Sequence, residues 1–354
     1  MVNVPLDETP FEEEEERDPK RPLRLQLLRF IPVVVVLGLL VHFLLPRLGT
    51  IQESVKTMTQ LAPWPIVFAI AFETLSYIAN GALLQSVIAM VGESLPIRRT
   101  IAIEIGAATV SLVAVGALGF GAAIYKWTRA RGVSRDAAML ASWLPSVFDA
   151  TTLVVFAFIG AANLLFFHRL SQTTGIALAA VISVLAAAIL AVVLLFARND
   201  LLERLAKRIG RLIKRYRPAA DESFLYDVVR RAEETWDRMK SGAWMRPAAC
   251  SLMVLTFDLL CLRYAFLAAG EAPKLSLLLA GYGVPILLGR ASFLPGGIAV
   301  IEVAMAALYA GLGIPTSVAV VAVLTYRLIS FWLPTAVGIP IAVTLQSRKH
   351  RKRS

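Results

Sequence analysis

The sequence has little charge, two cysteines and three histidines in 354 residues. The histidines, His42, His168 and His350, do not have the spacing of a metal site. No Walker motif is present, which argues against ATP-driven pumping by this chain alone. Cys250 and Cys261 lie too far apart along one helix for a disulfide. With no nucleophile–base set either, we expect a chain that is not an enzyme and needs no cofactor or metal.

Long apolar runs are what the sequence does contain. It is 57% hydrophobic and 17% charged, an apolar excess that one soluble core could not bury. The runs are continuous, whereas a membrane β-barrel would alternate apolar and polar residues. We therefore expect an all-α, polytopic membrane bundle with about 7–9 hydrophobic segments of near-spanning length. The runs cover residues 27–46, 64–91, 101–125, 137–167, 175–197, 247–269, 276–294, 297–312 and 317–345.

The charged residues divide the chain into a membrane domain and two tails. Residues 1–20 form an acidic tail that we expect to be disordered, 21–347 an integral membrane domain, and 348–354 a basic tail. Residues 198–246 form a basic loop that begins as an amphipathic helix suited to an anionic leaflet. Because bases flank apolar runs, they indicate lipid headgroups and the positive-inside bias rather than nucleic acid. We expect a bacterial-type inner membrane with both termini cytoplasmic.

For two segments, 101–125 and 287–312, the sequence leaves open whether the chain spans the membrane or turns back within it. Loops 92–100 and 126–135 are both basic, so a single span over 101–125 would place one of them outside. A re-entrant hairpin resolves this conflict, and the segment contains several glycines that permit a break. The segment 287–312, broken at Leu294-Pro295-Gly296-Gly297, has the same character. Each break is followed by a helix and a short glycine turn, which suggests the two inverted repeats found in many transporters.

Charged residues inside the apolar runs are the candidate functional residues. Each costs about 2.5–3.5 kcal/mol on insertion scales, so a role in binding or transport is the first hypothesis. A structural ion pair or hydrogen bond is the alternative for each. Glu73, Asp149, Asp258, Glu302 and Arg327 lie deep in their runs. Three others are nearer to run ends, where a long side chain can reach the interface: Glu104, Arg263 and Arg290.

The strongest local motif is the proline–glycine break before Glu302. Pro295-Gly296-Gly297 is predicted to end one helix and to start another at Gly297, with Glu302 one turn further in. A new helix presents unpaired N–H groups, which suit an anion. Arg327, which follows Tyr326, could pair with Glu302 or hold a phosphate, because its planar fork binds such groups bidentately.

These residues carry a family resemblance. Pro295-Gly296-Gly297-Ile298-Ala299-Val300-Ile301-Glu302, then Tyr326-Arg327, then Leu333-Pro334 with Gly338, resemble the C-terminal signature of the lysylphosphatidylglycerol synthase transmembrane-domain family. Ala299 stands where that signature has a second glycine. The resemblance implies a membrane domain that translocates or handles lipids. Its best-known members carry an aminoacyl transferase domain, which this sequence lacks, so we expect a stand-alone, flippase-like member related to glycolipid, polyprenyl-lipid or hopanoid pathways.

Our first hypothesis is a lipid translocase for a phospholipid, glycolipid, or polyprenyl- or hopanoid-type lipid. A secondary transporter of a small solute is one alternative, and a non-catalytic membrane partner of a lipid-modifying enzyme is another. We expect membrane lipids with anionic headgroups as partners, no nucleic acid, and leave a homo-oligomer open. The predicted substrate-binding residues are Glu73, Asp149, Asp258, Arg290, Pro295, Gly296, Gly297, Glu302, Tyr326 and Arg327.

Overall fold

The computed structural model describes residues 56–113, 116–167, 242–292 and 294–347, together with positions 180, 183, 186 and 187. All of these lie in one compact unit, Gly49–Ser354. Every regular element in the described residues is helical. Apart from those four positions of the predicted span 175–197, that span, the span 27–46, both tails and the amphipathic start of loop 198–246 lie outside the described part of the chain.

Four helices of the described part are long and apolar enough to cross a membrane. They are α4 (Pro63–Ala89), α7 (Arg135–Phe167), α11 (Met245–Ala268), and a continuous helix made of α14 (Thr316–Arg327), η4 (Leu328–Trp332) and α15 (Leu333–Ser347). At about 1.5 Å per residue, each exceeds the roughly 30 Å hydrocarbon layer. The predicted all-helical architecture is confirmed for these segments.

Four shorter helices form two hairpins. The first consists of α5 (Ile97–Val113) and α6 (Gly116–Arg129), and the second of α12 (Leu275–Ala291) and α13 (Val300–Gly311). In the first hairpin, Gly106 packs against the ring of Trp127. In the second, Tyr309 Oη donates to the carbonyl oxygen of Leu278 at 3.0 Å. Both predicted segments therefore turn back on themselves.

The break in the second hairpin is longer than the sequence predicted. The short helix η3 (Pro295–Gly297) follows α12, and α13 begins only at Val300. Gly296 and Gly297 both have φ of 63°, and Ala299 has φ of 69°. Because these conformations are incompatible with a right-handed helix, the predicted start at Gly297 is three residues early, and Glu302 lies in the first turn itself.

The two basic loops lie at the same end of the unit. The backbone N–H of Ser134 donates to Glu93 Oε2 at 2.9 Å, which joins the turn before α5 to the turn after α6. The segment 101–125 therefore does not cross the unit. This resolves the conflict between the two basic loops in the way the sequence predicted.

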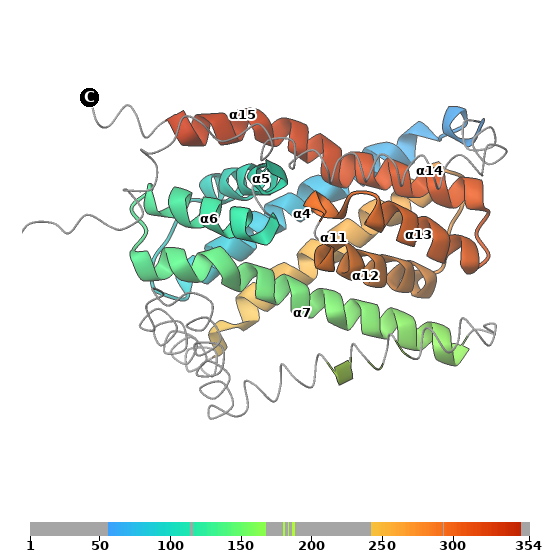
Figure 1. Cartoon of the computed structure of the whole chain (residues 1–354), viewed down its shortest axis with the longest axis horizontal. Helices are drawn as coiled ribbons and strands as arrows, with labels where there is room; N and C mark the ends of the chain where they lie inside the picture. Colours follow the sequence, from blue (N-terminus) through green and yellow to red (C-terminus); the bar gives the residue numbers. More distant parts are fainter. Residues whose placement is uncertain are drawn as a thin grey trace, which may run out of the picture. The chain divides into compact units, whose positions relative to one another are not determined.

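The order of elements occurs twice: a long helix, a hairpin, and a second long helix. Glycines of positive φ mark equivalent turns in both copies. Gly92 (80°) and Gly270 (89°) follow the first long helix, and Gly132 (87°) and Gly313 (95°) follow the hairpin. The helices α5 and α12 both have 17 residues. Figure 1 shows the first hairpin between α15 and α7, and the second between α14 and α7.

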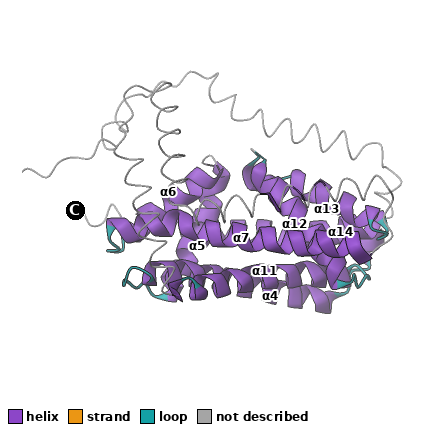
Figure 2. Cartoon of the chain, turned by 90° about the horizontal axis from the view of Figure 1, so that it is seen from below, coloured by secondary structure: helices purple, strands orange, loops and turns teal. Residues whose placement is uncertain are grey.

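The two copies have opposite orientations. Along α4 and α11, the backbone N–H of Ala62 bonds to the carbonyl of Ala268 at 3.0 Å, and Ser76 Oγ donates to the carbonyl of Val254 at 3.1 Å. Residue numbers rise along one helix as they fall along the other, so the first helices of the copies are antiparallel. Figure 2 shows α4 and α11 side by side, with the other labelled helices on one side of this pair. In the described residues, the first long helices of the two copies therefore run in opposite directions.

Two close helix crossings also lie at equivalent positions in the two copies. The helices α7 and α12 approach so closely that a Cβ on Gly283 would lie 2.6 Å from Cβ of Ala157. At the crossing of α15 with α5, a Cβ on Gly338 would lie 2.9 Å from the carbonyl oxygen of Ile105. Counted from the glycine turns, Gly338 corresponds to Ala157, and Ile105 corresponds to Gly283. Small residues thus permit backbone-to-backbone packing, as is common between membrane helices.

We predict that Gly283→Ala destabilises the protein by about 1–3 kcal/mol, the usual cost of overpacking a close contact. The reason is that the added methyl group meets backbone atoms of Ala157, which a rotamer change cannot move away. The measurement is thermal unfolding in detergent. Gly311→Ala is the matched control, because a Cβ on Gly311 has no neighbour within 4 Å. Equal melting temperatures for both variants would contradict the close crossing.

Candidate functional site

Arg327, at the end of α14, is held by three neighbours. Its Nε donates to Glu302 Oε1 at 2.6 Å, and its NH2 group donates to the carbonyl oxygen of Gly296 at 3.0 Å. The guanidinium also lies 4.3 Å from the centre of the Phe331 ring. Only 8% of the Arg327 side chain and 15% of the Glu302 side chain are exposed. Arg327 therefore joins α14 to η3 and α13, with its charge paired to Glu302 and two of its N–H groups engaged.

Pro295, Gly296 and Gly297 act mainly through their backbone. They form η3, and Gly296 supplies the carbonyl that receives Arg327. Gly297 lies against Gly289 of α12, where a Cβ would be 2.9 Å from the opposite Cα. The motif thus packs the break tightly against the hairpin and places Glu302 opposite Arg327.

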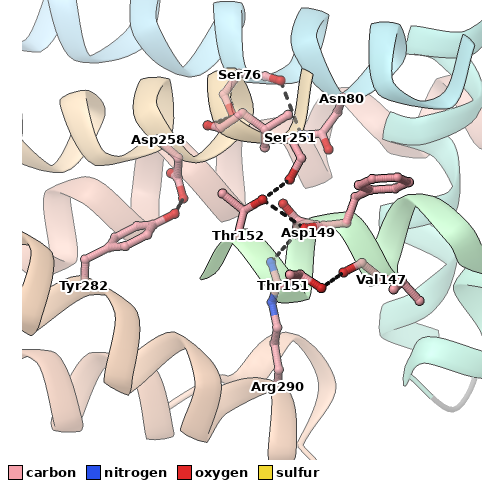
Figure 3. Close-up of polar contacts among 12 residues, drawn as sticks. Ser76, Asn80, Val147, Asp149, Thr151, Thr152, Ser251, Asp258, Tyr282 and Arg290 are labelled. Atoms are coloured by element: carbon pink, nitrogen blue, oxygen red, sulfur yellow. Dashed lines mark hydrogen bonds and ion pairs between the residues drawn. The ribbon is translucent and has the colours of Figure 1, made fainter. Parts of the chain in front are cut away.

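Arg290 and Asp149 form a second ion pair, between α12 and α7. Arg290 NH2 donates to Asp149 Oδ2 at 2.5 Å. The Arg290 side chain is 43% exposed on the described unit and the Asp149 side chain 16%. Figure 3 shows Arg290 reaching from its helix toward Asp149. Unlike Arg327, Arg290 combines a half-buried acidic partner with a side chain that is exposed over much of its surface.

Asp258, in the middle of α11, collects hydroxyl groups from two other helices. Tyr282 of α12 and Tyr326 of α14 donate to the same oxygen, Asp258 Oδ2, at 2.5 and 2.9 Å. Glu73 on α4 is a buried residue, only 6% exposed, and its carboxyl group interacts with Asp258. Four helices thus meet at one carboxyl pair.

Neutral polar side chains continue this region toward Asp149. Thr152 Oγ1 and Ser251 Oγ are hydrogen-bonded at 2.9 Å, and Asn80 Nδ2 donates to the carbonyl of Ser76 at 3.3 Å. Figure 3 shows Thr152 and Ser251 between Asp258 and Asp149, with Ser76 and Asn80 on the neighbouring helix α4. Our sequence reasoning missed them, and it also missed Tyr282. A hydroxyl or amide group that needs a partner inside an apolar run is the signal that could have found them.

The acidic side chains of this region outnumber its basic ones. Tyr77 of α4, whose Oη donates to the carbonyl of Ser330 at 3.3 Å, interacts electrostatically with Glu73, Glu104, Asp258 and Arg327. Glu104 also interacts with Asp149. Among the described residues of this interior, five carboxyl groups face two guanidinium groups, because Arg263 turns toward the carbonyl of Pro273 instead. We call this set the acidic cluster: Glu73, Glu104, Asp149, Asp258 and Glu302.

The fold and site define a polytopic α-helical membrane protein with a charged interior between two inverted halves. No group of three or more metal-ligating side chains occurs in the part of the chain that the structure describes. The architecture thus brings charged and hydroxyl side chains from distant parts of the sequence into one membrane-embedded region.

Comparison with known proteins identifies the family. The family model described as "Lysylphosphatidylglycerol synthase TM region" matches residues 29–338, so the chain belongs to this family. A relative described as "UPF0104 membrane protein", from Methanothermobacter thermautotrophicus, is 37% identical over 89 residues. That match spans 25% of this chain and 27% of the relative.

Proposed function

We propose that this protein is a lipid translocase, which moves the polar headgroup of a phospholipid, glycolipid or polyprenyl- or hopanoid-type lipid through the charged interior. The observation that carries this proposal is the Arg290–Asp149 pair, because it offers an accessible guanidinium at the border of a buried polar region. A guanidinium of this kind binds phosphate through paired, charge-assisted hydrogen bonds. The acyl chains would remain among the lipids. The proposal assigns no bond-making chemistry to the chain.

The inverted repeat supports this function. In transporters, two halves of opposite orientation enclose a binding site near the bilayer midplane, and rocking of one half opens the site to alternate sides. Here, two hairpins that do not cross the unit pack against long helices of the opposite copy, α7 with α12 and α15 with α5. We propose that both hairpins are re-entrant, one from each side of the membrane.

The charges at the two ends support an orientation. Six arginines of the described residues lie at the end where α5 begins and α11 starts: Arg98, Arg99, Arg129, Arg131, Arg135 and Arg246. The opposite end, with the turns at Gly270 and Gly313, carries Lys56 and Lys274 among the described residues. By the positive-inside rule, we propose that the arginine-rich end is cytoplasmic. The C-terminus would then be cytoplasmic as well, because α15 ends on that side.

Reconstitution tests the proposed function. Purified protein is placed in vesicles that contain a trace of fluorescent phosphatidylglycerol, and a membrane-impermeant reductant bleaches the outer leaflet. We expect protein-containing vesicles to lose more than the outer-leaflet share of fluorescence, whereas protein-free vesicles stop at that share. Native mass spectrometry of the gently purified protein would name the lipid it retains. The bleaching test is repeated with fluorescent versions of each lipid found bound. If vesicles with protein bleach no further than protein-free vesicles for every one of these lipids, the proposal is wrong.

A further inference from the structure

The Glu73–Asp258 pair contains two carboxyl groups with unfilled hydrogen-bonding positions. Glu73 Oε2 and Asp258 Oδ1 are both inaccessible, and neither has a partner among the described residues. The antiparallel register of α4 and α11, set by the Ala62–Ala268 and Ser76–Val254 hydrogen bonds, places the two residues at the same level, where their carboxyl groups interact. Two ionised carboxylates only accept hydrogen bonds, so this contact is favourable only if a proton lies between them.

Among the described residues, the surroundings of the pair supply hydroxyl donors, and the two nearest guanidinium groups, Arg290 and Arg327, are each already paired with another carboxylate. On α4 and α11 themselves, Tyr77 and Cys261 face the pair. Tyr282 from α12 and Tyr326 from α14 donate to the far oxygen of Asp258. Arg327 is engaged by Glu302 and the carbonyl of Gly296.

The other described helices that pack against α4 and α11 add further acids. Glu104 of α5 and Asp149 of α7 bring negative charge toward the same region, and η4 contributes no ionisable group. Two like charges in contact in a medium of low dielectric cannot both be ionised. Of the ways to neutralise the pair, a bound proton needs no ligands beyond those present.

We propose that Glu73 and Asp258 share one proton, and that this pair is the site through which a proton gradient drives lipid movement. The second part rests on the proposed function; the first does not. The pair takes up one proton from water on one side of the membrane, forming one O–H bond, and releases the same proton on the other side. No other bond is made or broken.

The position of the pair in the repeat provides the coupling. Glu73 and Asp258 lie on opposite halves, where the antiparallel helices α4 and α11 pack. A tilt of one half relative to the other therefore changes the distance between the carboxyl groups and the proton affinity that depends on it. Counted from the turns at Gly92 and Gly270, the equivalent residues are Ser251 and Asn80, which are neutral. The ionisable pair thus occupies one of two equivalent places.

Infrared spectroscopy of the full chain tests the shared proton. A protonated carboxyl group has a carbonyl stretch that shifts in heavy water and is absent from a carboxylate. We expect the band to appear, at neutral pH, in the difference spectrum obtained by subtracting the Glu73→Gln spectrum from that of the wild type. The difference spectrum between the wild type and Asp258→Asn should contain the band as well. Glu271→Gln, the same change in a turn outside the acidic cluster, should leave it in place. If neither variant lacks the band, the proposal of a shared proton is wrong.

A bound metal ion is a distinct outcome. If Na⁺ in place of choline raises the melting temperature of the wild type and removes the band, the pair holds a cation and the proposal is wrong. Using two variants protects the test, because a failure of one to fold leaves the other informative.

Vesicles of phosphatidylethanolamine and phosphatidylglycerol with the fluorescent lipid test the coupling. An imposed pH gradient should accelerate lipid movement by the wild type and by Glu271→Gln, but this stimulation should be lost in Glu73→Gln. If the wild type moves lipid at the same rate with and without the gradient, the coupling is wrong, but the proposed translocase function still stands. A carboxyl band without lipid movement under any condition would instead overturn the translocase and the coupling with it.

Discussion

Arg290→Gln is expected to abolish most lipid movement while the protein remains folded. The glutamine keeps a donor near Asp149 but removes the only guanidinium of the described interior that is both paired and substantially exposed. Hydrogen bonds to charged groups contribute about 1.5–3 kcal/mol each, so losing one lowers phosphate binding by roughly 10- to 100-fold. The measurement is the initial rate of fluorescent lipid movement in vesicles with equal amounts of protein.

A double variant separates lipid binding from the neutralisation of Asp149. Arg290→Gln with Asp149→Asn removes both charges and leaves no unpaired carboxylate at this place. If Arg290 binds the lipid, the double variant stays inactive. Recovery of activity would show instead that Arg290 only neutralises Asp149. Arg263→Gln is the matched control, because Arg263 also lies in an apolar helix but its contact is the Pro273 carbonyl at 3.4 Å.

Arg327→Met is expected to have the largest effect on stability, a loss of about 3–5 kcal/mol. Breaking a buried ion pair leaves its partner uncompensated, and here Glu302 would remain 15% exposed with no cation beside it. The carbonyl of Gly296 and the Phe331 ring lose their contacts as well. Arg327→Lys should recover only part of the loss, since an ammonium cannot reproduce the planar fork.

Thermal unfolding followed with a thiol-reactive dye measures this effect. The only two cysteines in the chain, Cys250 and Cys261, are free and buried, so the dye reports their exposure on unfolding. The double variant Arg327→Met with Glu302→Leu lacks both charges. It should have a higher melting temperature than Arg327→Met alone, because no buried charge is left without a partner. A single variant that melts like the wild type would contradict the structural role of Arg327.

Much of the architecture could be predicted from sequence because it depends on local features. The apolar runs predicted the long helices, and the charge conflict between two basic loops indicated the first hairpin. Glycine-rich breaks suggested a repeat, although the start of α13 was placed three residues early. The error has a local cause, since Ala299 takes a positive φ that its residue type does not predict.

The contacts inside the unit were much less predictable. Glu302 and Arg327 could be paired from sequence, since they lie on consecutive helices joined by a short turn. Asp149 and Arg290 are 141 residues apart, and Glu73 meets Asp258 across the junction of the two halves. Which residues face each other depends on how each helix is rotated about its axis. A helix that is apolar all round does not encode that rotation in a hydrophobic stripe.

The inverted repeat also has an evolutionary consequence. A chain of half this length would hold one long helix, one hairpin and one closing helix, and could complete this packing only by pairing with a second copy inserted in the opposite direction. Such a dimer has two identical sites, related by symmetry, so no substitution can alter one alone. Fusion of the copies removes that constraint. Glu73 with Asp258 on one side, and Ser251 with Asn80 on the other, are the kind of divergence that fusion permits: a symmetric ancestor would carry two such sites, and the fused chain retains one ionisable pair.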